Sequence, residues 1–101
     1  MNEIKAAENR RIRGQILNVL HMNCPNMLSE RQVTSWIEQL GYVTYGEIKG
    51  FLEYLKDAGY IAIEQKETKL LHQENCFVKI TPKGTNLFEG NIPEDPGIDL
   101  R

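Results

Sequence analysis

Every histidine and cysteine of the chain belongs to one of two short pairs. His21 stands three residues before Cys24, and His72 stands four residues before Cys76. Two imidazoles and two thiolates can fill the tetrahedral shell of a zinc ion, provided that the two pairs meet in the fold. The simpler interpretation is that both cysteines are small buried apolar side chains and that His21 favours the end of a helix. We therefore predict no metal site.

No other combination of residues points to catalysis. The sequence contains no phosphate-binding glycine loop, no pair of carboxylates at inward positions and no nucleophile placed beside a base. The glycines are accounted for by helix ends, turns and one helix face. We predict neither an enzymatic activity nor a cofactor.

Length and composition indicate one small intracellular module. The chain has 101 residues, of which 41% are hydrophobic and 26% charged, and 12 Lys and Arg stand against 14 Asp and Glu. A net charge of -2 excludes a polycation, so any contact with nucleic acid must be local. No apolar run approaches the roughly 20 residues of a membrane span, and no signal sequence is recognisable. We expect a cytoplasmic protein with reduced thiols and no membrane partner.

Two amphipathic segments follow a long first helix in the N-terminal half of the chain. Apolar residues at helical spacing predict the first helix over Glu3–Met22, and Pro25 helps to end it. Ser29 with Gln32 predicts a capping box, followed by an apolar face of Val33, Trp36, Ile37 and Leu40. Thr44 with Glu47 repeats the pattern, followed by Ile48, Phe51, Leu52 and Leu55. Gly41 and Gly59 are placed to end these two helices, whose short connection favours a crossed helix-turn-helix.

The rest of the chain alternates with a period of two before a last short helix. Ile61 and Ile63 begin a strand, residues 65–75 form a long polar tip, and residues 76–81 return as a second strand. Thr81 before Pro82 predicts a brief helix that ends at Gly90. We expect a domain over residues 1–90 and an exposed, acidic, proline-containing tail over residues 91–101. The two isoleucines of the tail also suit docking on the domain or on a partner.

This order of elements is that of an α+β winged helix-turn-helix domain, with a three-helix core, a β-hairpin wing, a short C-terminal helix and an extended tail. Met27 and Leu28 can supply a small extra strand. Two runs resemble the way in which bacterial winged-helix regulators leave the recognition helix and close the wing: Ala58-Gly59-Tyr60-Ile61 and Ile80-Thr81-Pro82-Lys83-Gly84.

A narrower resemblance extends over nearly the whole chain. It links the sequence to small winged-helix proteins of Mu-like phages and prophages that are regarded as regulators. The runs that carry it are Glu8-Asn9-Arg10-Arg11, Leu40-Gly41-Tyr42-Val43-Thr44, Leu55-Lys56-Asp57-Ala58-Gly59-Tyr60-Ile61, and Gly90 before Asp95-Pro96-Gly97-Ile98. This resemblance implies a phage context in a bacterial host.

The helix that would read DNA in this fold has an unusual outer surface. With its apolar face turned inward, Gly46, Gly50, Glu53 and Asp57 point outward at about 100° per residue. Two glycines and two acids suit the phosphate-lined groove of DNA poorly, because phosphate neutralisation supplies most of the affinity.

A DNA-binding regulator of phage genes is nevertheless our leading hypothesis, with contacts made mainly by the wing and the first helix. The candidate DNA-binding residues are the cations Arg10, Arg11, Arg13, Lys66 and Lys69, with His72 nearby, and the residues flanking the outer stripe, Tyr45, Lys49, Tyr54 and Lys56. The simpler interpretation of each cationic cluster, the arginines of the first helix and the lysines of the wing, is a solvated face.

The alternative is a winged helix that binds a phage or host protein, such as an assembly or packaging adaptor, and does not bind DNA. Gly46 and Gly50 would allow another backbone to approach closely, and Leu70 and Leu71 are apolar residues on the wing. The same residues are candidate contacts of a homodimer, which many winged-helix regulators form.

Overall fold

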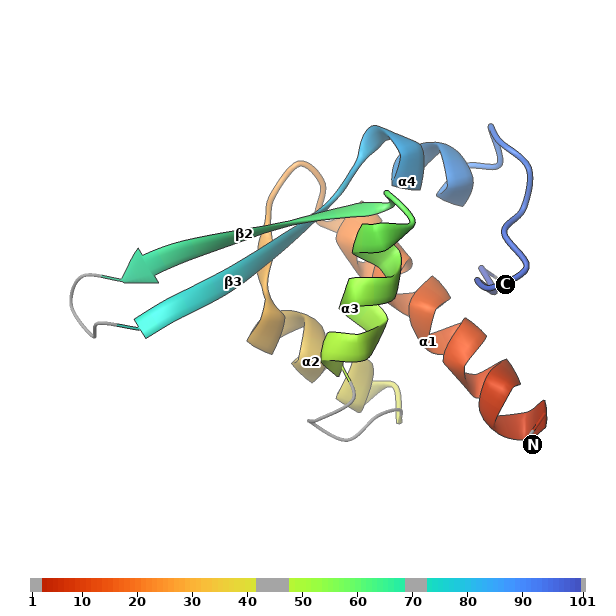
Figure 1. Ribbon diagram of the computed structural model, residues 1–101, viewed down its shortest axis with the longest axis horizontal. Helices are drawn as coiled ribbons and strands as arrows, with labels where there is room; N and C mark the ends of the chain where they lie inside the picture. The colour runs from red at the N-terminus through yellow and green to blue at the C-terminus, as the bar shows by residue number, and fades with distance from the viewer. Residues whose placement is uncertain (1–2, 42–47, 69–72, 101) are drawn as a thin grey trace.

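The computed structural model describes residues 3–41, 48–68 and 73–100, and at residues 66–68 and 73–75 it describes the backbone alone (Figure 1). In chain order, the elements are α1 (Glu3–Met22), β1 (Leu28–Ser29), α2 (Glu30–Gln39), α3 (Ile48–Asp57), β2 (Ile61–Thr68), β3 (Gln73–Ile80) and α4 (Pro82–Phe88). This order and these types are those predicted.

The strands form a small antiparallel sheet in the order β1-β3-β2. Leu28 pairs with Val78, while the register of β2 and β3 runs from Ile61 opposite Ile80 to residue 68 opposite residue 73. Figure 1 shows this two-stranded ribbon projecting beyond the helices. The predicted tip of residues 65–75 was too long, because the strands continue to a connection of residues 69–72. Their outer halves are polar and therefore lack the apolar alternation that marks a strand.

Local signals begin and end the helices where the sequence predicts. The Ser29 hydroxyl accepts a hydrogen bond from the Gln32 amide at 3.1 Å, and the Gln32 side chain accepts from the Ser29 amide at 2.9 Å. Gly41 and Gly59 adopt φ angles of 86° and 88°, which favour glycine at the end of a helix. Thr81 caps α4 with Pro82 in its first turn. The second predicted capping box, Thr44 with Glu47, lies outside the described residues.

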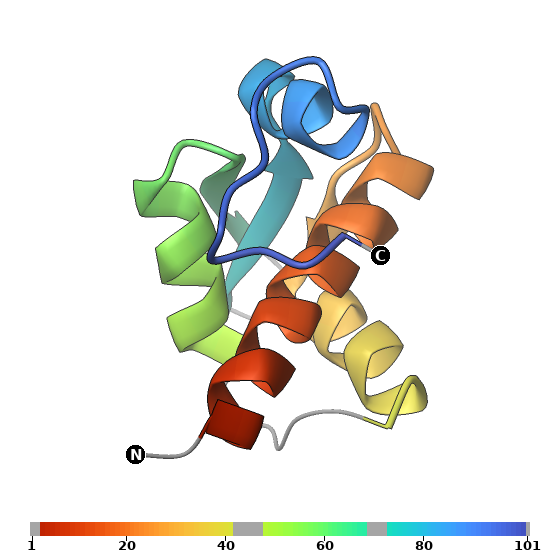
Figure 2. The same ribbon diagram turned by 90° about the vertical axis from the view of Figure 1, so that its right-hand side faces the viewer.

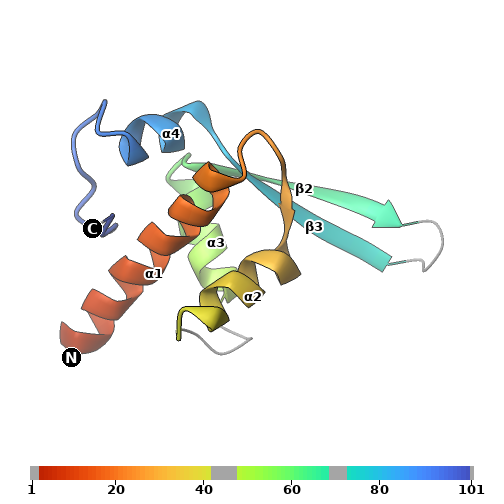
Figure 3. The same ribbon diagram turned by 180° about the vertical axis from the view of Figure 1, so that it is seen from behind.

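The core lies where α1 packs against α2, α3 and β3, with β3 also packed on α2 and β2 on α3 (Figure 3). The buried residues of α1 begin only at Ile12, so its first turns extend past the core and Ile4 is 79% exposed. The apolar residues of α3 predicted to face inward are all buried, whereas Gly50, Glu53 and Asp57 are exposed as predicted. The apolar core residues are Ile12, Ile16, Leu17, Val19, Leu20, Leu28, Val33, Ile37, Ile48, Phe51, Leu52, Leu55, Tyr60, Ile61, Val78, Ile80, Leu87 and Ile98.

The prediction that Trp36 shares the inward apolar face of α2, and is thus a core residue, was wrong. Its side chain is 40% exposed, and Leu40 after it is 47% exposed. The buried face of α2 is centred on Val33, Thr34 and Ile37, which rotates it away from Trp36. Thr34 can be buried because its hydroxyl donates to the Glu30 carbonyl at 2.8 Å.

The expected exposed tail is instead partly packed on the domain. Ile98 is 8% exposed and belongs to the core, and the segment runs from α4 across α3 and α1 (Figure 2). The alternative prediction, that the tail docks back on the domain, describes this segment correctly. Residues 95–100 are called the strap below.

Together, the crossed α2 and α3, the hairpin after α3 and the small β1 strand make a winged helix-turn-helix domain, as predicted. Its described length is 43 Å along the longest axis. Within the described ranges, no helix combines the length and apolar character that crossing a membrane requires.

Candidate nucleic-acid interface

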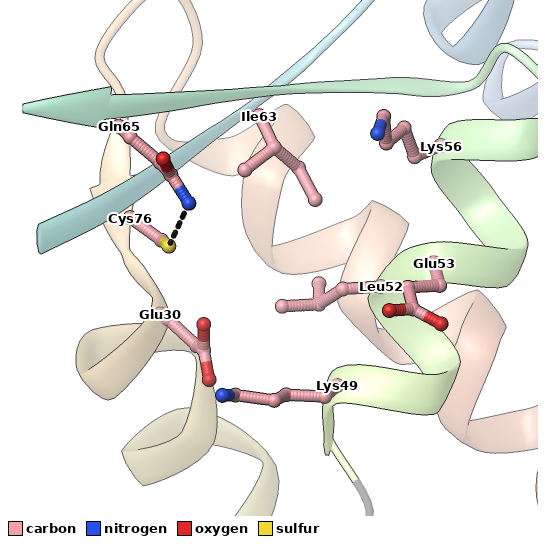
Figure 4. Close-up of a pocket in the computed structure, with 8 residues that line it drawn as sticks. All are labelled: Glu30, Lys49, Leu52, Glu53, Lys56, Ile63, Gln65 and Cys76. Carbon is pink, nitrogen blue, oxygen red and sulfur yellow. Dashed lines mark hydrogen bonds between the residues drawn. The ribbon is translucent and has the colours of Figure 1, made fainter.

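A groove of about 450 Å³ lies between α3, the start of α2 and the inner face of the wing (Figure 4). Its helix side is made by α3 and its opposite side by β2 and β3. The lining residues are Glu30, Lys49, Leu52, Glu53, Lys56, Ile63, Gln65 and Cys76.

Helical and strand periodicity together place these side chains. Lys49, Glu53 and Lys56 recur at helical spacing and therefore share one face of α3, and Leu52 forms an apolar floor between them. Gln65 and Cys76 are opposite each other in the β2–β3 register, and the Gln65 Nε2 lies 4.0 Å from the Cys76 Sγ. The groove is thus built by regular elements on both sides.

The charges of the groove balance. Lys49 and Lys56 contribute two positive charges, while Glu30 and Glu53 contribute two negative ones. Figure 4 shows the Lys49 side chain pointing toward Glu30. A phosphate approaching this groove would meet cations at its helix side and repulsion from the two carboxylates, so salt would affect any such contact strongly.

Two of the predicted DNA-binding residues, Lys49 and Lys56, line this groove. Lys66 is not among the lining residues, and the structure describes only its backbone, in β2. Gly50 is exposed on α3, and a Cβ added there would have no atom within 4 Å.

Arg13 and Tyr54 lie elsewhere. Tyr54 follows Lys49 by five residues and therefore points to roughly the opposite side of α3. The Arg13 guanidinium lies 3.9 Å from the centre of the Tyr54 ring and donates to the Gly97 carbonyl at 3.0 Å. Both side chains are therefore engaged with the strap rather than grouped with the groove lysines.

The remaining candidates are scattered or undescribed. Arg11 is exposed on α1, while Arg10 is half-buried and its backbone carbonyl accepts from the Asp99 amide at 3.0 Å. The candidates outside the described residues are Tyr45, Gly46, Lys69, Leu70, Leu71 and His72.

The histidine and cysteine pairs are not brought together where they are described. The His21 ring stacks on Phe88 with centroids 4.4 Å apart, and its Nε2 lies 3.2 Å from a Glu89 carboxylate oxygen. Cys24 is exposed, contrary to the expected burial, and Cys76 is half-buried in the groove. Among the described residues, no group of three or more His, Cys, Asp and Glu side chains could hold a metal.

Sequence reasoning did not assign Glu30 and Gln65 to the site. Glu30 begins α2 and shares no motif with α3, and Gln65 lies where the sequence indicates the tip rather than a strand. The continuation of the period-two pattern from Ile61 through Ile63 was the signal that could have identified Gln65 as a groove residue.

Several solved structures share the fold. The chain is similar to Bacillus subtilis PadR in complex with operator DNA, with a TM-score of 0.66 and 24% identity over 86% of this chain and 50% of PadR. It is also similar to a candidate transcriptional regulator, TA0346, from Thermoplasma acidophilum, with a TM-score of 0.61 and 22% identity over 74% of this chain and 70% of that one. The protein smu.1704 of Streptococcus mutans aligns with a TM-score of 0.60 and 16% identity over 83% and 92% of the two chains.

These similarities show the winged-helix fold, and the chain spans about half the length of PadR. No family model and no curated protein matches the sequence.

Proposed function

We propose that this chain is a DNA-binding transcriptional regulator that contacts DNA with α3 and the wing. The observation that carries the proposal is the groove between these two elements, with Lys49 and Lys56 on its helix side. In DNA-binding helix-turn-helix domains, the second helix of the motif lies in the major groove. PadR, which shares this fold, was solved with operator DNA.

The strand backbone that borders the major groove would pass between α3 and the wing. Lys49 and Lys56 would then contact phosphates. This proposal gives α3 a larger part in DNA contact, and α1 a smaller one, than the sequence prediction did. The reason is that Arg13 of α1 already binds Gly97 and Tyr54. The acidic Glu30 and Glu53 would keep non-specific affinity low.

A salt titration tests this proposal. A duplex selected by the protein from a random library is titrated by fluorescence anisotropy at several salt concentrations. The Lys49→Gln, Lys56→Gln double variant should reduce the slope of log K against log salt by about 0.9 for each phosphate that is no longer neutralised. Lys79→Gln, an exposed lysine of β3 outside the groove, is the matched control and should leave the slope unchanged. Absence of selectable DNA, or equal slopes for all three proteins, contradicts the proposal.

A second candidate function, a protein-interaction module, is favoured by the exposed side of α2. A shallow hollow of about 400 Å³ there is lined by Trp36, Arg31, Gln32, Ser35 and Gln39. Tryptophan and arginine are enriched among residues that dominate protein interfaces. Association with a phage or host protein that is insensitive to salt and abolished in Trp36→Ala, without DNA binding, would support this adaptor function.

The phage setting and the homodimer are finer parts of the proposal. The phage context rests on the sequence resemblance, and it implies action in the bacterial cytoplasm. Identifying the DNA or protein recovered with this chain from induced cells tests that context. A light-scattering mass of one chain at micromolar concentration would contradict the homodimer.

A further inference from the structure

The strap is held by a set of specific contacts although it has no regular secondary structure. The Tyr60 hydroxyl donates to the Asp95 carboxylate at 2.7 Å, and the same carboxylate accepts from the Gly97 amide at 2.8 Å. Arg13 binds the Gly97 carbonyl, and Ile98 inserts its side chain into the core. Different residues of the domain thus contact the turn, the Asp95 carboxylate and the apolar Ile98 side chain of the strap.

The surface beneath the strap is shaped to fit it. A Cβ on the buried Gly14 of α1 would collide with the Asp99 carbonyl oxygen, and one on Gly97 would collide with the Tyr54 hydroxyl. The Asp99 amide donates to the Arg10 carbonyl of α1. The backbone of the strap therefore rests directly on the backbone of α1.

The strap also joins the two helices between which it lies. On one side it contacts α1, and on the other it contacts Tyr54 of α3 and Tyr60 just after α3 (Figure 2). Arg13 of α1 stacks on Tyr54 while it binds Gly97, so a single side chain ties both helices to the strap.

We propose that the surface of α1 and α3 beneath the strap is a peptide-binding site whose ligand is this chain's own Asp-Pro-Gly-Ile segment, and that its occupancy holds α3 in position. The ligand class is a short peptide with an aspartate-led turn followed by a β-branched residue. Because the strap is tethered, its effective concentration is on the order of millimolar. A free peptide at millimolar concentration should therefore replace a strap that has been weakened.

Two variants of the whole 101-residue chain test the strap and the surface beneath it separately. Ile98→Asp damages the ligand, and we expect its Tm to fall by roughly 8–15 °C. Gly14→Ala blocks the receptor. Alanine within a helix would by itself raise the Tm by a few degrees, so a fall in this variant indicates that the strap has been displaced.

A synthetic peptide of residues 91–101 then tests binding in trans. At millimolar concentration it should restore most of the decrease in Tm of Ile98→Asp and should leave Gly14→Ala unchanged. The same peptide with aspartate in place of its isoleucine is the matched control. If Ile98→Asp proves too unstable, Ile98→Ala, which shortens the same apolar side chain of the strap, serves as the milder variant. Failure of the peptide to rescue either strap variant overturns the binding site.

Hydrogen exchange tests whether the site positions α3. Amides of Ile48–Asp57 should exchange faster in Ile98→Asp at a temperature where it is folded, and the peptide should slow them again. Rescue of the Tm without slower exchange in α3 overturns the positioning role.

The link to DNA rests on the proposed function and has its own measurement. Ile98→Asp should weaken DNA affinity several-fold, and the peptide should reverse this effect. If the parent protein binds no DNA, the proposed function fails while peptide rescue and hydrogen exchange still decide the peptide site. If the parent binds DNA and Ile98→Asp binds equally well, the positioning role is overturned.

Discussion

The two sides of α3 are built in opposite ways. On the wing side, Lys49, Glu53 and Lys56 surround an open groove and their charges face solvent. On the strap side, the Arg13 guanidinium lies over the Tyr54 ring. Gly97 lies so close to the Tyr54 hydroxyl that a Cβ added to this glycine would collide with it. The difference indicates that one helix can combine a closely fitted surface for stability with an open surface for recognition. It also separates arginines and tyrosines that stabilise the fold from lysines that are available to a ligand.

The strongest test of this comparison is Arg13→Ala. The variant removes a charged hydrogen bond to Gly97 and a cation–π interaction with Tyr54, so we expect the free energy of unfolding to fall by about 2 kcal/mol. Arg11→Ala, two residues away and exposed, should change it by less than about 0.5 kcal/mol. Urea denaturation of both variants provides the measurement. Equal decreases would mean that the strap side is no more closely fitted than the surface.

Tyr60→Phe gives a smaller effect with a distinctive pH dependence. Removal of its hydrogen bond to Asp95 should cost about 1 kcal/mol at neutral pH. Burial first, and then the bond to Asp95, raise the pKa of Tyr60 from 10 to about 12. The folded state thus favours the neutral phenol, so its contribution is complete below pH 10 and is lost as the pH rises to about 12.

The Tm difference between the parent protein and Tyr60→Phe should therefore shrink across the interval from pH 10 to about pH 12. Thermal scans at closely spaced pH values would show it. A difference that stays constant across this interval would contradict the role assigned to the phenol.

Gly50→Ala probes the open side and has the smallest expected effect. An added Cβ would have no atom within 4 Å, so the helix propensity of alanine should raise the free energy of unfolding by about 0.5–1 kcal/mol. Chemical denaturation measures the increase. A decrease in stability would show that this side of α3 is more tightly packed than the structure describes.

Elements defined by local signals were predictable from the sequence. The Ser29 and Gln32 capping box, the two helix-ending glycines and Thr81 before Pro82 each act within a few residues, and all of them are confirmed. The groove lysines were also predictable, because the inward face of α3 fixes its outward face.

Features that depend on distant contacts were not predictable in the same way. The exposure of Trp36 follows from the rotation of α2 about its axis, which the elements packed against α2 determine. The engagement of Arg13 with Gly97 joins residues 84 positions apart, and no local pattern distinguishes it from a solvated arginine. The outer half of the wing lacks apolar residues and therefore gave no periodic signal.

The strap also bears on when the protein can finish folding during synthesis. Arg10 and Asp99 are joined by a backbone hydrogen bond although they lie at opposite ends of the sequence. A chain emerging from the ribosome can form the helix-turn-helix and the hairpin early, but α1 can complete its packing only after residue 99 has left the exit tunnel. Chains that terminate before residue 99 would therefore keep part of α1 uncovered, and cellular proteases could distinguish them from chains that carry the strap.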